Sequence, residues 1–152
     1  MDLLGAFRRR PFLTSTEREQ IEAGLATARR HAAAPIALII DERASGDPEV
    51  RARQLFQDWE LADAKRSRAI LVYACAATRR FAVIGGDEIR RVAPETLWKT
   101  LQGDLARHFE EARYCDGLFK AVANAAIMQH SAFVAANGCH SPAPSPPARS
   151  DP

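Results

Sequence analysis

Two short hydrophobic runs lie in the middle of the chain, and the other elements can be placed relative to them. The runs Ala69–Ala76 and Phe81–Ile84 are separated by the polar break Thr78-Arg79-Arg80. Two runs rich in β-branched and aromatic residues, joined by a few polar ones, predict a β-hairpin. Because both runs are nearly continuous in hydrophobicity rather than alternating, we expect helices to cover both faces of the strands.

A helix is predicted near the start of the chain. Its N-terminus offers two capping-box registers, Thr14 with Glu17 and Thr16 with Glu19. Apolar residues then recur at helical spacing, and the helix is expected to run to about His31.

A strand and a second helix are predicted before the hairpin. The strand covers the β-branched run Ile36–Ile40, and Asp47-Pro48 is typical of a helix start because the proline nitrogen needs no hydrogen-bond partner there. A crossover helix between this strand and the hairpin favours a parallel first pair, whereas the hairpin itself is antiparallel. The chain is therefore predicted to be an α/β domain with a mixed sheet.

Two further helices are predicted after the hairpin. Asp87–Val92 is expected to form a turn or a single helical turn, Pro94 opens a longer helix, and Asp116 is expected to cap the last helix, which ends near Asn137-Gly138. The predicted inner faces of these two helices comprise Leu97, Trp98, Leu101, Leu105, His108 and Phe109, and then Leu118, Phe119, Val122, Ala125, Ala126 and Gln129.

Composition changes this picture little. The 152 residues suit one domain with a real core, and the net charge of +2 gives no reason to expect binding to nucleic acid. We expect a domain over residues 13–137, an N-terminal arm over 1–12 and a disordered tail rich in Pro and Ser over 138–152. The three cysteines form no CxxC pair, which argues against structural zinc and disulfides and favours a cytoplasmic location.

The sequence also predicts no integral membrane segment, because no stretch approaches the roughly 20 apolar residues that a span needs. Leu3, Leu4 and Phe7, followed by Arg8-Arg9-Arg10, leave open a weak anchor at a membrane surface. An exposed or loosely packed start of the chain is the alternative.

Acidic residues at strand ends are the candidate functional residues. Asp41 follows the first predicted strand, and Asp87 and Glu88 follow the third. Ligands of open α/β sheets bind beyond the carboxyl ends of the parallel strands, and carboxylates are suited to Ca²⁺ or Mg²⁺. The alternative is that these residues are ordinary loop acids and helix caps. Motifs for a nucleophile, a nucleotide or an organic cofactor are missing from the sequence.

Several motifs resemble those of a known family. The stretch Arg68–Arg90, which contains RRFAVIGGDEI, is followed by Pro94, Trp98 and the segment Ala112–Leu118. Together these residues resemble the TPM domain, especially a short, soluble bacterial branch of that family. The resemblance covers roughly Leu13 to His130 and implies a three-layer α/β/α sandwich with a mixed sheet and a central β-hairpin.

The resemblance also implies possible functions. Some members of the family are similar to acid phosphatases, and several bind calcium or another divalent ion at acidic loops. The family's Gly-Asp before Gly-Ile is Gly85-Gly86 in this chain, so Asp87 comes one place late and Glu88 stands where glycine is usual. Asp116-Gly117 matches the family pattern.

These observations lead to three hypotheses. The first is a small binding domain for a protein partner that the sequence does not identify, with Asp87, Glu88 and Asp41 as candidate ligands of Ca²⁺ or Mg²⁺. The second is a metal-assisted, acid-phosphatase-like hydrolase in which the ion polarises a phosphoryl oxygen. The third is a membrane-surface protein anchored through Leu3 to Arg10.

Overall fold

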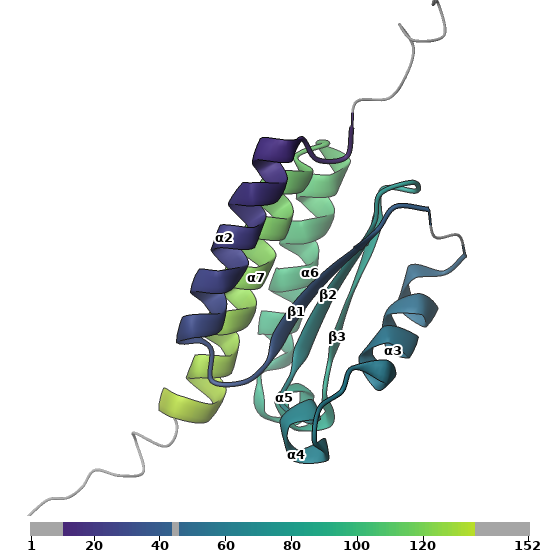
Figure 1. Cartoon of the computed structure of the whole chain (residues 1–152). Coiled ribbons are helices and arrows are strands. Elements are labelled where there is room, and N and C mark those ends of the chain that lie inside the picture. Colours follow the sequence, from purple (N-terminus) through teal and green to yellow (C-terminus); the bar gives the residue numbers. More distant parts are fainter. Residues whose placement is uncertain (1–10, 44–45, 136–152) are drawn as a thin grey trace, which may run out of the picture.

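The computed structural model describes residues 11–43 and 46–135 (Figure 1). In chain order the elements are α2 (Ser15–His31), β1 (Ile36–Asp41), α3 (Pro48–Asp58), α4 (Asp63–Arg66), β2 (Ile70–Cys75), β3 (Arg80–Gly85), α5 (Asp87–Val92), α6 (Glu95–Glu110), α7 (Tyr114–His130) and a π-helical turn, η1 (Ser131–Ala135). The predicted N-terminal anchor and the predicted tail over 138–152 lie outside the described residues.

The sheet has the strand order β1-β2-β3. β1 runs parallel to β2, and β2 pairs antiparallel with β3, which confirms both predicted pairings. All residues of β2 are buried, as expected for a central strand with both faces covered.

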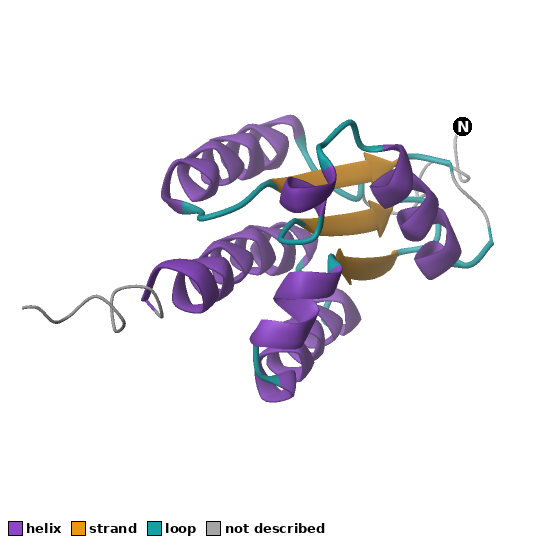
Figure 2. Cartoon of the chain, turned by 90° about the horizontal axis from the view of Figure 1, so that it is seen from below, coloured by secondary structure: helices purple, strands orange, loops and turns teal. Residues whose placement is uncertain are grey.

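Helices cover the two faces of the sheet, with α2, α6 and α7 on one side and α3 on the other (Figures 1 and 2). The side chains of β2 alternate between two cores. Ile70, Val72 and Ala74 point into the larger core beneath α2, α6 and α7. Leu71, Tyr73 and Cys75 point into the smaller core beneath α3. The three-layer α/β/α arrangement with a mixed sheet agrees with the prediction.

Local sequence signals fix where two of the helices start. Thr14 caps α2 in a complete capping box with Glu17, so the first of the two predicted registers is the one that forms. Asp47 caps α3 by accepting a hydrogen bond from the backbone of Glu49, with Pro48 in the first turn. In both cases a side-chain oxygen satisfies a backbone N–H that has no partner within the helix.

Three expectations about the later helices were wrong. Asp116 is not the N-cap of the last helix: α7 already begins at Tyr114, and Asp116 lies in its first turn, 3.0 Å from Arg113. Leu97 and Phe119 are 41% and 43% exposed rather than part of the inner faces. The other predicted inner residues of both helices are buried, so each apolar stripe is narrower than the periodicity suggested. No helix in the described part of the chain is long and apolar enough to cross a membrane.

Candidate functional site

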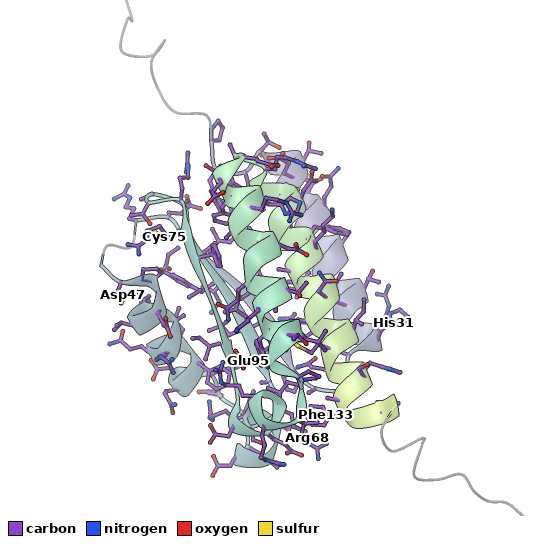
Figure 3. The ribbon with its side chains drawn as sticks, turned by 180° about the vertical axis from the view of Figure 1, so that it is seen from behind. His31, Asp47, Arg68, Cys75, Glu95 and Phe133 are labelled. Carbon is purple, nitrogen blue, oxygen red and sulfur yellow. The ribbon has the colours of Figure 1, made fainter. Side chains whose placement is uncertain are left out.

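The predicted acidic residues lie at opposite ends of the sheet. Asp41 is the last residue of β1 and is level with Cys75 at the end of β2, whereas Gly85, at the end of β3, is level with the start of β2. Figure 3 shows this separation through Cys75 at one end of the molecule and Arg68, beside the start of β2, at the other. Six strand residues span about 20 Å. Asp41 therefore cannot share an ion with Asp87 and Glu88.

Asp41 belongs to a hydrogen-bonded cluster beneath α3. Its Oδ2 accepts a 2.8 Å hydrogen bond from the hydroxyl of Tyr73 and lies 3.3 Å from Nε of Arg51. Burial, reinforced by the hydrogen bond to Asp41, raises the pKa of Tyr73 far above its ordinary value. The neighbouring acid, Glu42, is ion-paired with Arg18. The carboxylate of Asp41 thus ties β1 to β2 and α3.

Glu88 is bound by an arginine through both of its carboxylate oxygens. Nε and Nη2 of Arg68 lie 3.0 and 3.2 Å from Oε1 and Oε2, and the hydroxyl of Ser67 is 3.4 Å from Oε1. The hydrogen bond from Arg68 is the main reason that the pKa of Glu88 is lowered. A cation at Glu88 would have to compete with a guanidinium already in bidentate contact, so this carboxylate is poorly suited as a metal ligand.

Asp87 lies in a small cleft together with an acid that the sequence analysis missed. The cleft has a volume of about 370 Å³, and Asp63, at the start of α4, lines it as well. Neither carboxylate has an ion pair among the described residues. Nothing in the local sequence places Asp63 in the same cleft as Asp87, because the cleft depends on how α4 and Ser67 pack beside the loop after β3.

Gly86, in the loop after β3, has no room for a side chain. A Cβ atom on Gly86 would come within 2.2 Å of the carbonyl oxygen of Arg66 and 2.5 Å of that of Ser67. Both are backbone atoms that a side chain cannot displace. The first acidic side chain of the loop after β3 is that of Asp87.

These acids do not form a complete metal site. Within residues 11–43 and 46–135, no group of three or more His, Cys, Asp or Glu side chains is positioned to hold an ion. A carboxylate pair supplies few of the six to eight oxygens that Ca²⁺ takes. The residues present do not fit a tightly held divalent ion, and binding of Ca²⁺ or Mg²⁺ at Asp87 stays a prediction.

A second cleft follows the outer edge of β3 and is basic. Its volume is about 400 Å³, and it is lined by β3 together with residues of α3, α5 and α6. Its basic residues are Arg53, Arg80 and Arg90 and its acidic residues are Asp47 and Glu49, so the cleft is net positive. The guanidinium carbon of Arg90 lies 5.4 Å from the centroid of the Trp98 ring, which belongs to α6. In the sequence, Arg80 belongs to the polar break of the hairpin, and no pattern there indicates this cleft.

Three residues with potentially reactive side chains lie outside these two clefts. Cys75 is 3% exposed within the smaller core. His108 is buried in α6, where Nδ1 lies 2.7 Å from the carbonyl oxygen of Asp104. Burial is the main cause that raises the pKa of Cys115, so its thiol is less readily ionised. None of these residues has the arrangement of an activated nucleophile.

The fold and these clefts define a small α/β/α domain with a three-stranded mixed sheet. The family model described as the TPM domain matches residues 8–127, and the chain belongs to this family. No curated protein matches the chain.

Several solved structures have the same fold. The BA42 protein of the psychrophilic bacterium Bizionia argentinensis is 20% identical, with a TM-score of 0.71, over 83% of this chain and 87% of that one. The N-terminal domain of a P. gingivalis protein is 18% identical, with a TM-score of 0.61, over 79% and 78%. The N-terminal domain of cg2496 from Corynebacterium glutamicum is 12% identical, with a TM-score of 0.57, over 77% and 74%. At these identities the likeness concerns the fold alone.

Proposed function

We propose that this TPM domain protein is a binding domain for another protein rather than a metal-dependent enzyme. The observation that carries the proposal is the bidentate contact between Arg68 and Glu88, at 3.0 and 3.2 Å. This contact engages the carboxylate of Glu88, which could otherwise hold an ion together with the neighbouring Asp87. Asp41, at the far end of the sheet, cannot take its place.

The chemistry of hydrolysis supports this reading. A metal-assisted phosphatase needs an ion that is held firmly while it polarises the phosphoryl oxygen or activates water. Here the loop after β3 offers one unpaired carboxylate, Asp87, with Asp63 across the cleft. Such a pair favours weak binding of hydrated ions over the fixed coordination that catalysis requires.

Two measurements on the purified chain test the proposal. The first is hydrolysis of p-nitrophenyl phosphate with millimolar Ca²⁺ or Mg²⁺, for which we expect no turnover above that of Asp87→Ala. The second is affinity capture with in-cell crosslinking, for which we expect a defined protein partner that is retained when a chelator is present. Metal-dependent phosphatase activity that disappears in Asp87→Ala would overturn the proposal.

The metal-assisted, phosphatase-like hydrolase is the second candidate, and one observation favours it. Asp63 and Asp87 line the same cleft, and neither has an ion pair among the described residues. In this case the two carboxylates would hold the ion. Activity would then be lost in both Asp63→Asn and Asp87→Asn but retained in Asp41→Asn, which serves as the matched control at the far end of the sheet.

The remaining hypothesis concerns a membrane surface. The residues on which it rests, Leu3 to Arg10, lie outside the described part of the chain. Sedimentation with anionic vesicles at low salt tests it, and absence of binding would dismiss it. The cytoplasmic location likewise stays a prediction, which localisation of a tagged chain would check.

A further inference from the structure

We propose that the outer edge of β3 binds an extended, acidic segment of a partner protein, which adds to the sheet as a fourth strand. The inference rests on the proposed binding function and specifies its surface and the chemistry of its ligand. Three features of the described residues carry it: the free backbone groups of β3, the cleft beside them and the charges on the walls of that cleft.

The backbone of β3 has hydrogen-bonding groups with no partner in the described part of the chain. The N–H of Gly86 donates to the carbonyl of Ala69 at 3.0 Å, so Gly86 and Ala69 form a hydrogen-bonded pair of the antiparallel ladder between β2 and β3. Because hydrogen-bonded pairs alternate with non-hydrogen-bonded ones, Phe81, Val83 and Gly85 direct their N–H and C=O groups outward. These groups recur at every second residue, which is the pattern that an added strand requires.

The space beside this edge is suited to an extended chain. All six residues of β3, from Arg80 to Gly85, line the cleft of about 400 Å³. An added strand would lie about 4.8 Å from β3, between the wall formed by α3 and the wall formed by α5 and α6. Its side chains would point alternately toward these two walls.

The walls carry three arginines, Arg53, Arg80 and Arg90, against the two carboxylates of Asp47 and Glu49. Arg53 is paired with Glu49 at 2.7 Å, and the carboxylate of Asp47 caps α3. Arg80 and Arg90, however, have no acidic partner among the described residues. Because these two guanidinium groups form no ion pair within the described chain, acidic side chains on the incoming segment would be favoured beside them.

The two arginines mark the ends of the binding edge. Arg80 is the first residue of β3. Arg90 lies beside its last residue, because a Cβ atom on Gly85 would be 3.3 Å from Cγ of Arg90. A segment of about six residues that pairs with the whole of β3 would therefore pass both guanidinium groups.

The opposite edge of the sheet, formed by β1, is less suited to this role. The carbonyl of Ile36 already accepts a 2.9 Å hydrogen bond from Nε of Arg29. The basic cleft lies at β3 and not at this edge. Strand addition at β1 is therefore an outcome to be distinguished by experiment rather than a second proposal.

The probe is a blocked eight-residue peptide of alternating glutamate and valine, and the control probe replaces each glutamate with lysine. Amide-resolved NMR titration of the whole chain is expected to show saturable shifts for Phe81, Val83 and Gly85 with the acidic peptide only. Binding is expected to weaken about tenfold or more in R80E/R90E. The charge-matched control R30E/K120E, on the exposed surface of α2 and α7, should bind as the wild type does.

A backbone variant tests the strand geometry separately. Val83→Pro removes one outward N–H, and proline is tolerated at the edge of a sheet. We expect weaker binding with retained dispersion of the amide spectrum. If this variant does not fold, R80E/R90E still decides the question, because both side chains are exposed.

Three results would overturn the proposal: no saturable shift at millimolar acidic peptide, equal binding of the lysine peptide, or shifts confined to β1. A protein partner whose capture is unchanged in R80E/R90E would overturn this inference and leave the proposed binding function intact. Metal-dependent phosphatase activity lost in Asp87→Ala would overturn the function itself. The two failures are thereby distinguishable.

Discussion

The hydroxyl of Tyr73 donates a 2.8 Å hydrogen bond to the carboxylate of Asp41, and this contact joins the middle of β2 to the last residue of β1. Tyr73 has no exposed surface, whereas the side chain of Asp41 is 25% exposed. Arg51 of α3 reaches the same oxygen. The bond therefore holds three elements of the smaller core together at one end of the sheet.

Loss of this bond should destabilise the fold measurably. Tyr73→Phe removes the donor, and because the acceptor is charged we expect the free energy of unfolding to fall by about 1–2 kcal/mol. Urea denaturation measures this change. The control is Tyr114→Phe, whose hydroxyl has no hydrogen bond within the described residues and which should change stability by less than about 0.5 kcal/mol. Equal effects of the two variants would contradict the prediction.

Glu88 should make the stability depend on acidic pH. Its pKa is lowered in the folded state by Arg68, so the unfolded chain takes up the proton first as the pH falls. The stabilisation from the ion pair is fully present above the ordinary pKa of 4.5 and is lost as the pH falls through the lower folded value. The difference in unfolding free energy between wild type and Glu88→Gln should shrink over that range. A difference that stays constant down to the acid transition would be evidence against the ion pair.

Gln129 is expected to be sensitive to substitution because it binds the chain just before two strands. Its Nε2 donates to the carbonyl oxygens of Pro35 and Arg68, at 3.0 and 2.9 Å, and the residue has no exposed surface. Gln129→Leu leaves both carbonyls without this donor and should lower stability by about 2–4 kcal/mol. The exposed Gln54→Leu on α3 is the matched control, with an expected change of less than about 0.5 kcal/mol.

Two glycines should respond to alanine with opposite signs. A Cβ atom on Gly86 would overlap the backbone of Arg66 and Ser67, so Gly86→Ala should destabilise the chain or distort the loop before Asp87. Gly103 lies within α6, and no atom is within 4 Å of its Cβ position. Gly103→Ala should therefore raise the free energy of unfolding by about 0.5–1 kcal/mol, because alanine favours the helix. Thermal denaturation measures both, and destabilisation by Gly103→Ala would contradict this view of the site.

We expect the two ends of the sheet to respond independently to added metal ions. We expect Ca²⁺ and Mg²⁺ to cause only weak amide shifts near Asp63 and Asp87, at millimolar concentration, because a carboxylate pair offers few ligands. Asp41→Asn should leave these shifts unchanged, since Asp41 lies at the other end of the strands. Shifts of the Asp41 and Asp87 amides that saturate together, at the same concentration, would contradict the separation.

Much of the fold could be predicted because its signals are local. The capping box of Thr14 with Glu17, the Asp47-Pro48 helix start and the polar break at Thr78-Arg79-Arg80 each act within a few residues. The antiparallel hairpin was predicted too, and it already implied that the end of β3 returns to the start of β2. The grouping of Asp41 with Asp87 and Glu88 did not take this into account.

The clefts could not be predicted, because they depend on contacts between distant segments. Asp63 and Asp87 line one cleft because α4 packs on the loop at Gly86. The exposure of Phe119 likewise follows from tertiary packing, since its ring lies against Gly24 of α2 on the outer side of the helices. Periodicity identifies an apolar stripe, but neighbours decide which of its edge residues are covered.

The side chain of Gln129 also has a consequence for the order in which the chain can fold. Its two hydrogen bonds reach back 94 and 61 residues, and α7 packs against α2, the first helix of the described chain. During synthesis the hairpin can form from neighbouring residues, but the larger core stays open until α7 has left the ribosome. A nascent chain that ends before α7 is therefore expected to remain sensitive to proteases and to acquire resistance only once α7 is included.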